Sequence, residues 1–222
     1  MKEIFTLSEE NYLKAIYHLS TEEMESVSTN ALAERLETTA ASVSDMLKKL
    51  AKKELIEYKK YQGVNISEKG KRVALQIIRK HRLWEVFLVE KLSFNWDEVH
   101  EIAEQLEHID SPTLVKRLDE FLGYPKFDPH GDPIPDESGE FQSMPQMALS
   151  EMEANQSGLL VGVKDTNSLF LRHLDKIGAY IGAKVKVLEK VEFDGSVEIL
   201  LEDKKTLFIS KEVATNLLIT KR

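Results

Sequence analysis

The sequence predicts a mainly α-helical chain that ends in a small all-β domain. Over most of the first 120 residues, apolar side chains recur every three or four positions, which is the period of an amphipathic helix. Five of the six prolines then fall between residues 124 and 145, where they exclude regular helix and mark a linker or an ordered loop. Beyond this segment, short runs alternate or stay apolar at strand length.

Length and composition narrow the class of protein. With 222 residues and 42% hydrophobic content, the chain can form one large domain or two to three small domains, each with a hydrophobic core. The absence of cysteine excludes disulfides, thiolate zinc sites, iron-sulfur ligation and cysteine nucleophiles. The N-terminal residues form no apolar export signal, and no apolar run approaches the length of a membrane span, so we expect a cytoplasmic protein.

The N-terminal elements predict a DNA-binding unit. Thr6 and Glu9 have the spacing of a capping box, so a first helix is expected from Leu7 to about Ser20. Two helices at 29–36 and 40–53, joined by a brief turn, form a helix-turn-helix. Residues 55–66 then read as two short strands around a polar turn, which extends the unit to a winged helix.

Three further helices are expected before the proline-rich segment. Ser67 caps a long helix that runs to about Leu92, with an apolar face wider than one small domain needs. Asn95 opens the next helix, and Ser111 begins another that ends at Gly123. Near the C-terminus, strands at 158–163, 183–188, 196–201 and 206–209 suggest a small closed barrel, with a hairpin turn at Asp194-Gly195.

Charge is distributed unevenly along the chain, although the net charge is only −8. Residues 40–82 hold 12 Lys or Arg against four acids, whereas residues 83–153 hold four bases against 17 acids. A basic block followed by an acidic block indicates one part that binds phosphates and another that binds cations.

Metal-ligand side chains gather in the acidic block. His100, Glu104, Glu107 and His108 would fall within an arc of roughly 100° on one helix, which makes that face a chelating surface. A second pair, His81 and Glu85, lies four residues apart on the preceding helix and could meet it. Two imidazoles and two carboxylates facing a further His and Glu indicate a divalent metal site.

The donor set restricts the metal. Carboxylate and imidazole without sulfur suit Mn²⁺, Fe²⁺ and Zn²⁺, and the general affinity order favours zinc over manganese, so selectivity must come from coordination number and geometry. Because the ligands lie on separate helices, a bound ion would fix their mutual positions and convert binding energy into orientation. Such a site can act as a switch.

The helix expected at 40–53 has the features of a DNA-reading helix. It begins with small and hydroxyl residues that permit close approach in the major groove, and its apolar face is expected to pack into the domain. We expect Thr39, Ser42 and Asp45 to face base edges or sugars. Contacts with the DNA backbone are assigned to Ser44 and Lys48 on the helix and to Lys59 and Lys60 on the wing.

These motifs together resemble the metal-dependent repressors of the DtxR/MntR family. The resemblance covers the winged-helix start, Arg79-Lys-His-Arg-Leu-x-Glu85, Val99-His-(x)3-Glu-(x)2-Glu-His108 and Asp132-Pro-Ile-Pro135. It implies a winged helix-turn-helix domain over 1–72, a helical dimerisation and metal-sensing domain over 73–142, and a linker with a C-terminal SH3-like (FeoA-like) domain over 143–222. It also implies a homodimer in which metal enables binding to palindromic, double-stranded operator DNA, which represses metal-uptake genes.

The resemblance also divides the ligands between two metal positions. One position would use His81, Glu85 and His100, and the other would use Glu104, Glu107 and His108 with Asn11 from the first helix. Glu104 agrees with manganese-responsive members, which makes Mn(II) the preferred cofactor and Fe(II) the second. Lys14 stands where some manganese-responsive members have a second carboxylate.

Two other classes of function stay open at the level of sequence. An enzyme could use the clustered Glu and His as a di-metal centre or a metal-assisted hydrolase, although no Glu-x-x-His repeats on separate helices and no nucleophile motif appears. A winged-helix regulator could instead respond to an organic ligand and keep a purely structural metal site. An enzyme should turn over a substrate without DNA, and an organic-ligand sensor should bind DNA equally with and without a chelator.

Overall fold

The computed structural model describes residues 5–23, 26–59, 63–142 and 144–221. It divides into two compact units, each assembled from three separate segments. Unit 1 contains Met1–His81, Glu104–Val115 and Pro135–Glu140, and unit 2 contains Arg82–Ala103, Lys116–Ile134 and Phe141–Arg222. Among the described residues, none of the helices combines the length and the apolar character that crossing a membrane requires.

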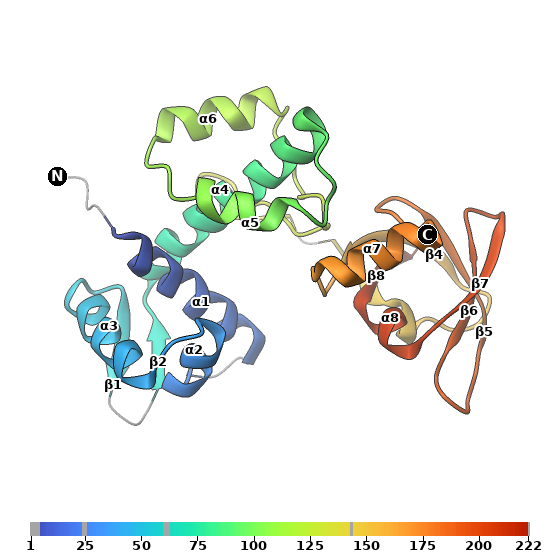
Figure 1. The fold of residues 1–222 in the computed structure, drawn as a ribbon, viewed down its shortest axis with the longest axis horizontal. Coiled ribbons are helices and arrows are strands. Elements are labelled where there is room, and N and C mark those ends of the chain that lie inside the picture. The colour runs from blue at the N-terminus through green and yellow to red at the C-terminus, as the bar shows by residue number, and fades with distance from the viewer. Residues whose placement is uncertain (1–4, 24–25, 60–62, 143, 222) are drawn as a thin grey trace. The chain divides into compact units, whose positions relative to one another are not determined.

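The N-terminal part of unit 1 is the winged helix that the sequence predicted. Helices α1 (Leu7–Glu23), α2 (Thr29–Arg35) and α3 (Ala40–Lys52) gather beside the antiparallel strands β1 (Ile56–Lys59) and β2 (Gly63–Ile66) (Figure 1). The capping box is present, since Thr6 N donates to Glu9 Oε2 at 2.9 Å and Glu9 N donates to Thr6 Oγ1 at 3.3 Å. Fully buried leucines from all three helices form the core of this part: Leu13, Leu32, Leu47 and Leu50.

Two of the next three helices match their predicted bounds. Helix α4 (Glu68–Leu92) begins directly after Ser67, whose hydroxyl accepts a hydrogen bond from Gly70 N at 3.0 Å, and α6 (Pro112–Phe121) begins with its proline. Helix α5 is shorter than expected, because it covers only Val99–Leu106 and leaves Glu107 and His108 in the turn that follows. The chain turns directly after the helix, where Ile109 N donates to Leu106 O at 3.1 Å.

The proline-rich segment contains no helix among its described residues, as predicted, but it is ordered. A bridge joins Phe127 to Pro133, and Asp128 N donates to Asp132 O at 3.0 Å. Asp128 and His130 are buried at the centre of this loop. The segment therefore packs as part of the fold instead of acting as a free linker.

The C-terminal part of unit 2 is a six-stranded antiparallel sheet, in the order β3-β8-β4-β5-β6-β7. The strands are β3 (Met147–Ala148), β4 (Ser157–Val163), β5 (Lys184–Lys190), β6 (Val197–Leu201), β7 (Lys205–Ile209) and β8 (Leu217–Lys221). Their alternating buried residues form one core with residues of the 3₁₀ turn Leu149–Glu151. The predicted small β domain is confirmed.

Two helices and two strands of this domain, β3 and β8, were not predicted from the sequence. Helix α7 (Ser168–Ile177) lies between β4 and β5, and α8 (Lys211–Asn216) leads directly into β8 (Figure 1). The ladder is also not closed among the described residues, since the two-residue strand β3 pairs with β8 while β7 pairs with β6. The prediction of a closed barrel is therefore wrong for the described residues. The chain enters a 3₁₀ helix directly after β3, so this strand is too short to pair with β7 as well as with β8.

Candidate metal centre and nucleic-acid interface

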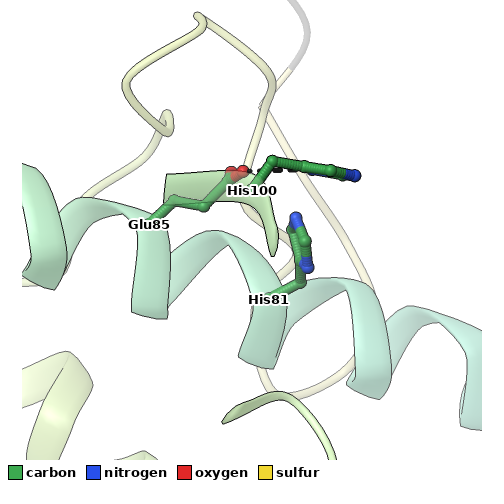
Figure 2. Close-up of side chains that lie close together, drawn as sticks. All are labelled: His81, Glu85 and His100. Atoms are coloured by element: carbon green, nitrogen blue, oxygen red, sulfur yellow. Dashed lines mark ion pairs between the residues drawn. The ribbon is translucent and has the colours of Figure 1, made fainter. Parts of the chain in front are cut away.

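The first group of potential ligands contains His81, Glu85 and His100. His81 and Glu85 lie one turn apart on α4, and Figure 2 shows their side chains directed toward His100. Glu85 Oε1 is 3.5 Å from His100 Nδ1, and one ligand atom from each of the three residues lies within 4.8 Å of the others. His81 and Glu85 are buried and His100 is exposed, so the group has one side open to solvent.

The second group lies within unit 1 and contains His81, Glu104 and Glu107, with ligand atoms again within 4.8 Å of one another. Glu107 is fully buried, and its Oε2 is 2.6 Å from His81 Nδ1. His81 therefore belongs to both groups. The sequence analysis had placed it in the first group alone, because the imidazole geometry that turns Nδ1 toward Glu107 has no signature in the spacing.

A lysine contributes the positive charge of the second group. Lys14 Nζ on α1 donates to Glu104 Oε1, to Glu107 Oε1 at 2.7 Å and to Glu107 Oε2 at 2.9 Å. Burial opposes ionisation of Glu107, but the hydrogen bond from His81 and the charge of Lys14 outweigh burial and hold the pKa of Glu107 below its usual value. The carboxylate is therefore kept ionised, as a metal ligand requires.

Two further residues were predicted for this position, and His108 lies beside Glu107 but outside both groups. His108 Nδ1 contacts Glu10 Oε2 at 2.5 Å, and its Nε2 is 3.8 Å from Glu107 Oε1. Asn11 Oδ1 is buried, and among the residues that the structure describes none donates a hydrogen bond to it. A buried carbonyl oxygen without a donor is costly, so it fits a cation ligand.

The predicted DNA-contacting residues on α3 lie along one accessible face. Thr39, Ser42, Asp45 and Lys48 are exposed and Ser44 is half-buried, whereas Val43, Leu47 and Leu50 on the opposite face are fully buried. Lys48 Nζ is 2.9 Å from Asp45 Oδ1, and the hydrogen bond and charge of Lys48 lower the pKa of that carboxyl. On the wing, Lys59 ends β1, while Lys60 lies outside the described residues.

Comparisons with known proteins match three successive parts of the chain. Residues 4–64 match the N-terminal DNA-binding domain of the iron-dependent repressors, residues 67–136 their metal-binding and dimerisation domain, and residues 147–221 the FeoA domain. The iron-dependent repressor IdeR of Mycobacterium bovis is 34% identical over 126 residues, which cover 57% of this chain and 54% of IdeR, so the match spans about half of that relative.

A second relative decides the family. The HTH-type transcriptional regulator MntR of Oceanobacillus iheyensis is 32% identical over 123 residues, which cover 55% of this chain and 82% of MntR. The chain belongs to the DtxR/MntR family. A solved structure titled as a manganese-dependent transcriptional repressor in complex with manganese covers 96% of this family member with 34% identity, a TM-score of 0.84 and full coverage of its own chain.

This DtxR/MntR family member has a third cluster of buried ionisable groups that sequence reasoning missed. Glu85, Asp128 and His130 place ligand-type atoms within 4.8 Å of one another, and all three residues are buried. Burial and the nearby Glu85 raise the pKa of Asp128 to about 7. Burial opposes protonation of His130, but the Glu85 carboxylate, whose Oε2 is 3.7 Å from His130 Nδ1, and the nearby Asp128 raise its pKa to about 9. The His in Asp128-Pro-His-Gly131 was the available signal.

The loop that carries His130 also holds the β domain within unit 2. His130 Nε2 bonds to Trp96 O at 2.8 Å, and Val163 N on β4 donates to His130 O at 3.0 Å. Gly131 has φ +89°, and a Cβ built there would lie 2.0 Å from Val161 O. Only glycine fits this close approach, so residue 131 fixes how the loop meets β4.

Proposed function

We propose that this protein is a cytoplasmic, homodimeric transcriptional repressor that binds palindromic operator DNA when Mn(II) occupies its ligand groups, and that it represses metal-uptake genes. Fe(II) is the second candidate metal. The observation that carries the proposal is the pair of His and Glu groups that share His81, together with a winged helix whose first helix reaches the second group through Lys14.

Manganese is favoured by the chemistry of the donors. The two groups offer carboxylates and imidazoles, and Asn11 adds a buried amide oxygen without a hydrogen-bond donor among the described residues. Oxygen-rich sites suit the harder divalent ions, whereas a sulfur ligand would favour softer ones. We assign His81, Glu85 and His100 to one position, and Glu104, Glu107, His108 and Asn11 to the other, with His81 adjoining both.

The proposed mechanism transmits the state of the metal site through α1. Glu10 contacts His108 and Lys14 contacts Glu104 and Glu107, so α1 reaches the end of α5 and the turn after it, while α1 also packs against α2 and β2 of the winged helix. Glu104 on α5, Glu107 in the turn after it and Asn11 on α1 would hold a divalent ion, whose charge would keep these side chains at fixed separation. In a dimer, the two α3 helices would then stand about one DNA turn, ~34–36 Å, apart.

Dimerisation is proposed from exposed apolar side chains in the helical part of unit 2. Leu92 at the end of α4 is 53% exposed, and Phe121 at the end of α6 is 64% exposed. Phe121 contacts Phe87, with 6.3 Å between the ring centroids, and Lys91 Nζ lies over its ring at 5.8 Å from the centroid, yet most of the residue stays exposed. Such apolar groups are typical of the core of a homodimer interface.

The direct test is fluorescence anisotropy of the full chain on DNA from its own promoter, at fixed salt, with Mn²⁺ and anaerobic Fe²⁺ titrated against a chelated control. We expect binding only with metal, and the lower activating concentration ranks the two metals. Equal binding in chelator would contradict the metal-dependent mechanism and favour a regulator of another kind, with a structural metal site.

Lys48→Gln should weaken DNA binding by about three- to tenfold for every sequence tested, because the exposed lysine is assigned to a phosphate. The slope of log affinity against log salt should fall by about one for each subunit. Lys204→Gln, which removes an equally exposed charge from the turn between β6 and β7, is the matched control. An unchanged salt slope in Lys48→Gln would remove this residue from the interface.

A further inference from the structure

The ammonium group of Lys14 lies where a cation bound by Glu104 and Glu107 would lie. It reaches one oxygen of Glu104 and both oxygens of Glu107, the latter at 2.7 and 2.9 Å. The Lys14 side chain is only 15% exposed and Glu107 is fully buried, so water screens this pair little, whereas 36% of the Glu104 side chain is exposed. All three residues belong to unit 1.

The same carboxylate oxygens cannot serve an ammonium and a metal ion at once. A divalent ion needs them at ~2.0–2.3 Å, which would bring it within a few ångströms of the Lys14 charge. Two cations at that distance in a poorly screened site repel strongly. Lys14 must therefore leave the carboxylates before a metal ion can use them.

We propose that Lys14 is an intramolecular competitor of the metal, whose ammonium occupies the cation position between Glu104 and Glu107 and thereby sets the metal concentration at which that position fills. The inference rests on the proposed function for its biological meaning, but not for its chemistry. Because Lys14 belongs to α1, its ammonium also ties α1 to the end of α5 in the absence of an ion.

The expected change in metal affinity depends on the fraction of conformers in which Lys14 occupies the carboxylates. A ligand that binds only a fraction of the conformers has its apparent Kd raised by the inverse of that fraction. If Lys14 holds the carboxylates in nine conformers out of ten or more, removing its charge tightens metal binding by about tenfold or more. Lys14→Met keeps an unbranched apolar stem and removes the ammonium, so it isolates this contribution.

The experiment titrates Mn²⁺ into the full chain without DNA and follows free Mn²⁺ by its electron paramagnetic resonance signal. All variants carry His100→Ala, which removes a ligand of the first group so that the position formed by Glu104 and Glu107 dominates the isotherm. We expect Lys14→Met to lower the apparent Kd by about tenfold or more. Lys14→Arg, which keeps the charge, should not tighten binding.

Three results separate this inference from its alternatives. Lys14→Met with an unchanged or weaker affinity overturns it, and so does equal tightening in Lys14→Arg. Adding Glu107→Gln to Lys14→Met should abolish the gain; a persisting gain places the effect elsewhere and also overturns the inference. If circular dichroism shows that Lys14→Met melts early, Lys14→Gln replaces it. Since the titration contains no DNA, its result can still be interpreted if the protein proves not to be a repressor.

Discussion

Glu107→Gln is expected to remove metal-stimulated DNA binding, raising the Mn²⁺ concentration needed for half-maximal binding by about 100-fold or more. Glu107 is fully buried and its two oxygens meet Lys14 and His81, so its substitution removes a buried negative charge from the centre of the second group. Glutamine has the same shape but only one acceptor oxygen and no charge. Fluorescence anisotropy against added Mn²⁺ measures the shift.

The control for this prediction is Glu120→Gln, an exposed carboxylate on α6. It should leave the activation curve unchanged, and circular dichroism should show that both variants keep the helical content of the parent. If Glu107→Gln responded to Mn²⁺ at the parent concentration, Glu107 would be a structural partner of His81 and Lys14, and the second metal position would have to lie elsewhere.

Gly131→Ala is expected to destabilise the fold by about 2–4 kcal/mol, because Gly131 is buried against the backbone of β4. An alanine at position 131 would have to adopt a positive φ. Its methyl group would also clash with the backbone, since its position lies 2.0 Å from Val161 O and 2.5 Å from Gly162 Cα. Backbone atoms cannot rotate aside as a flexible side chain would. The melting temperature should fall by about 5–15 °C.

Gly178→Ala provides a matched control for the strain in φ. Gly178 ends α7 with φ +82°, close to the value at Gly131, but no heavy atom lies within 4 Å of the position of an added Cβ. Its substitution should therefore cost only about 1 kcal/mol. Equal melting temperatures for the two variants would show that the loop can move away from β4, against the close approach described above.

Local signals in the sequence predicted the winged helix well. Thr6 and Glu9, or Ser67 and Gly70, are three residues apart, so their hydrogen bonds depend on nothing but the local backbone. Both ends of α7 also carry local sequence signals, since Asn167 caps its start and Gly178 caps its end. That helix was missed because the apolar runs around it were read as strands alone.

The contacts between charged residues far apart in the chain could not be predicted from the sequence. Residue types and spacing identified His81, Glu85, His100, Glu104 and Glu107 as candidates, and the structure brings them together in two groups. The contact of Lys14 with Glu104 spans 90 positions, and no period in the sequence links two such residues. The shorter α5 also changed how Glu107 is presented, because a helix end depends on the following turn.

The division into units has a consequence for how this protein can be dissected. The chain crosses from one compact unit to the other five times, at 81–82, 103–104, 115–116, 134–135 and 140–141. Neither unit is a continuous stretch, so a single protease cut or a simple truncation cannot release either one intact. A chimera joined at one point between residues 81 and 104 would therefore separate segments that pack in the same unit, since unit 1 contains both the winged helix and the stretch Glu104–Val115.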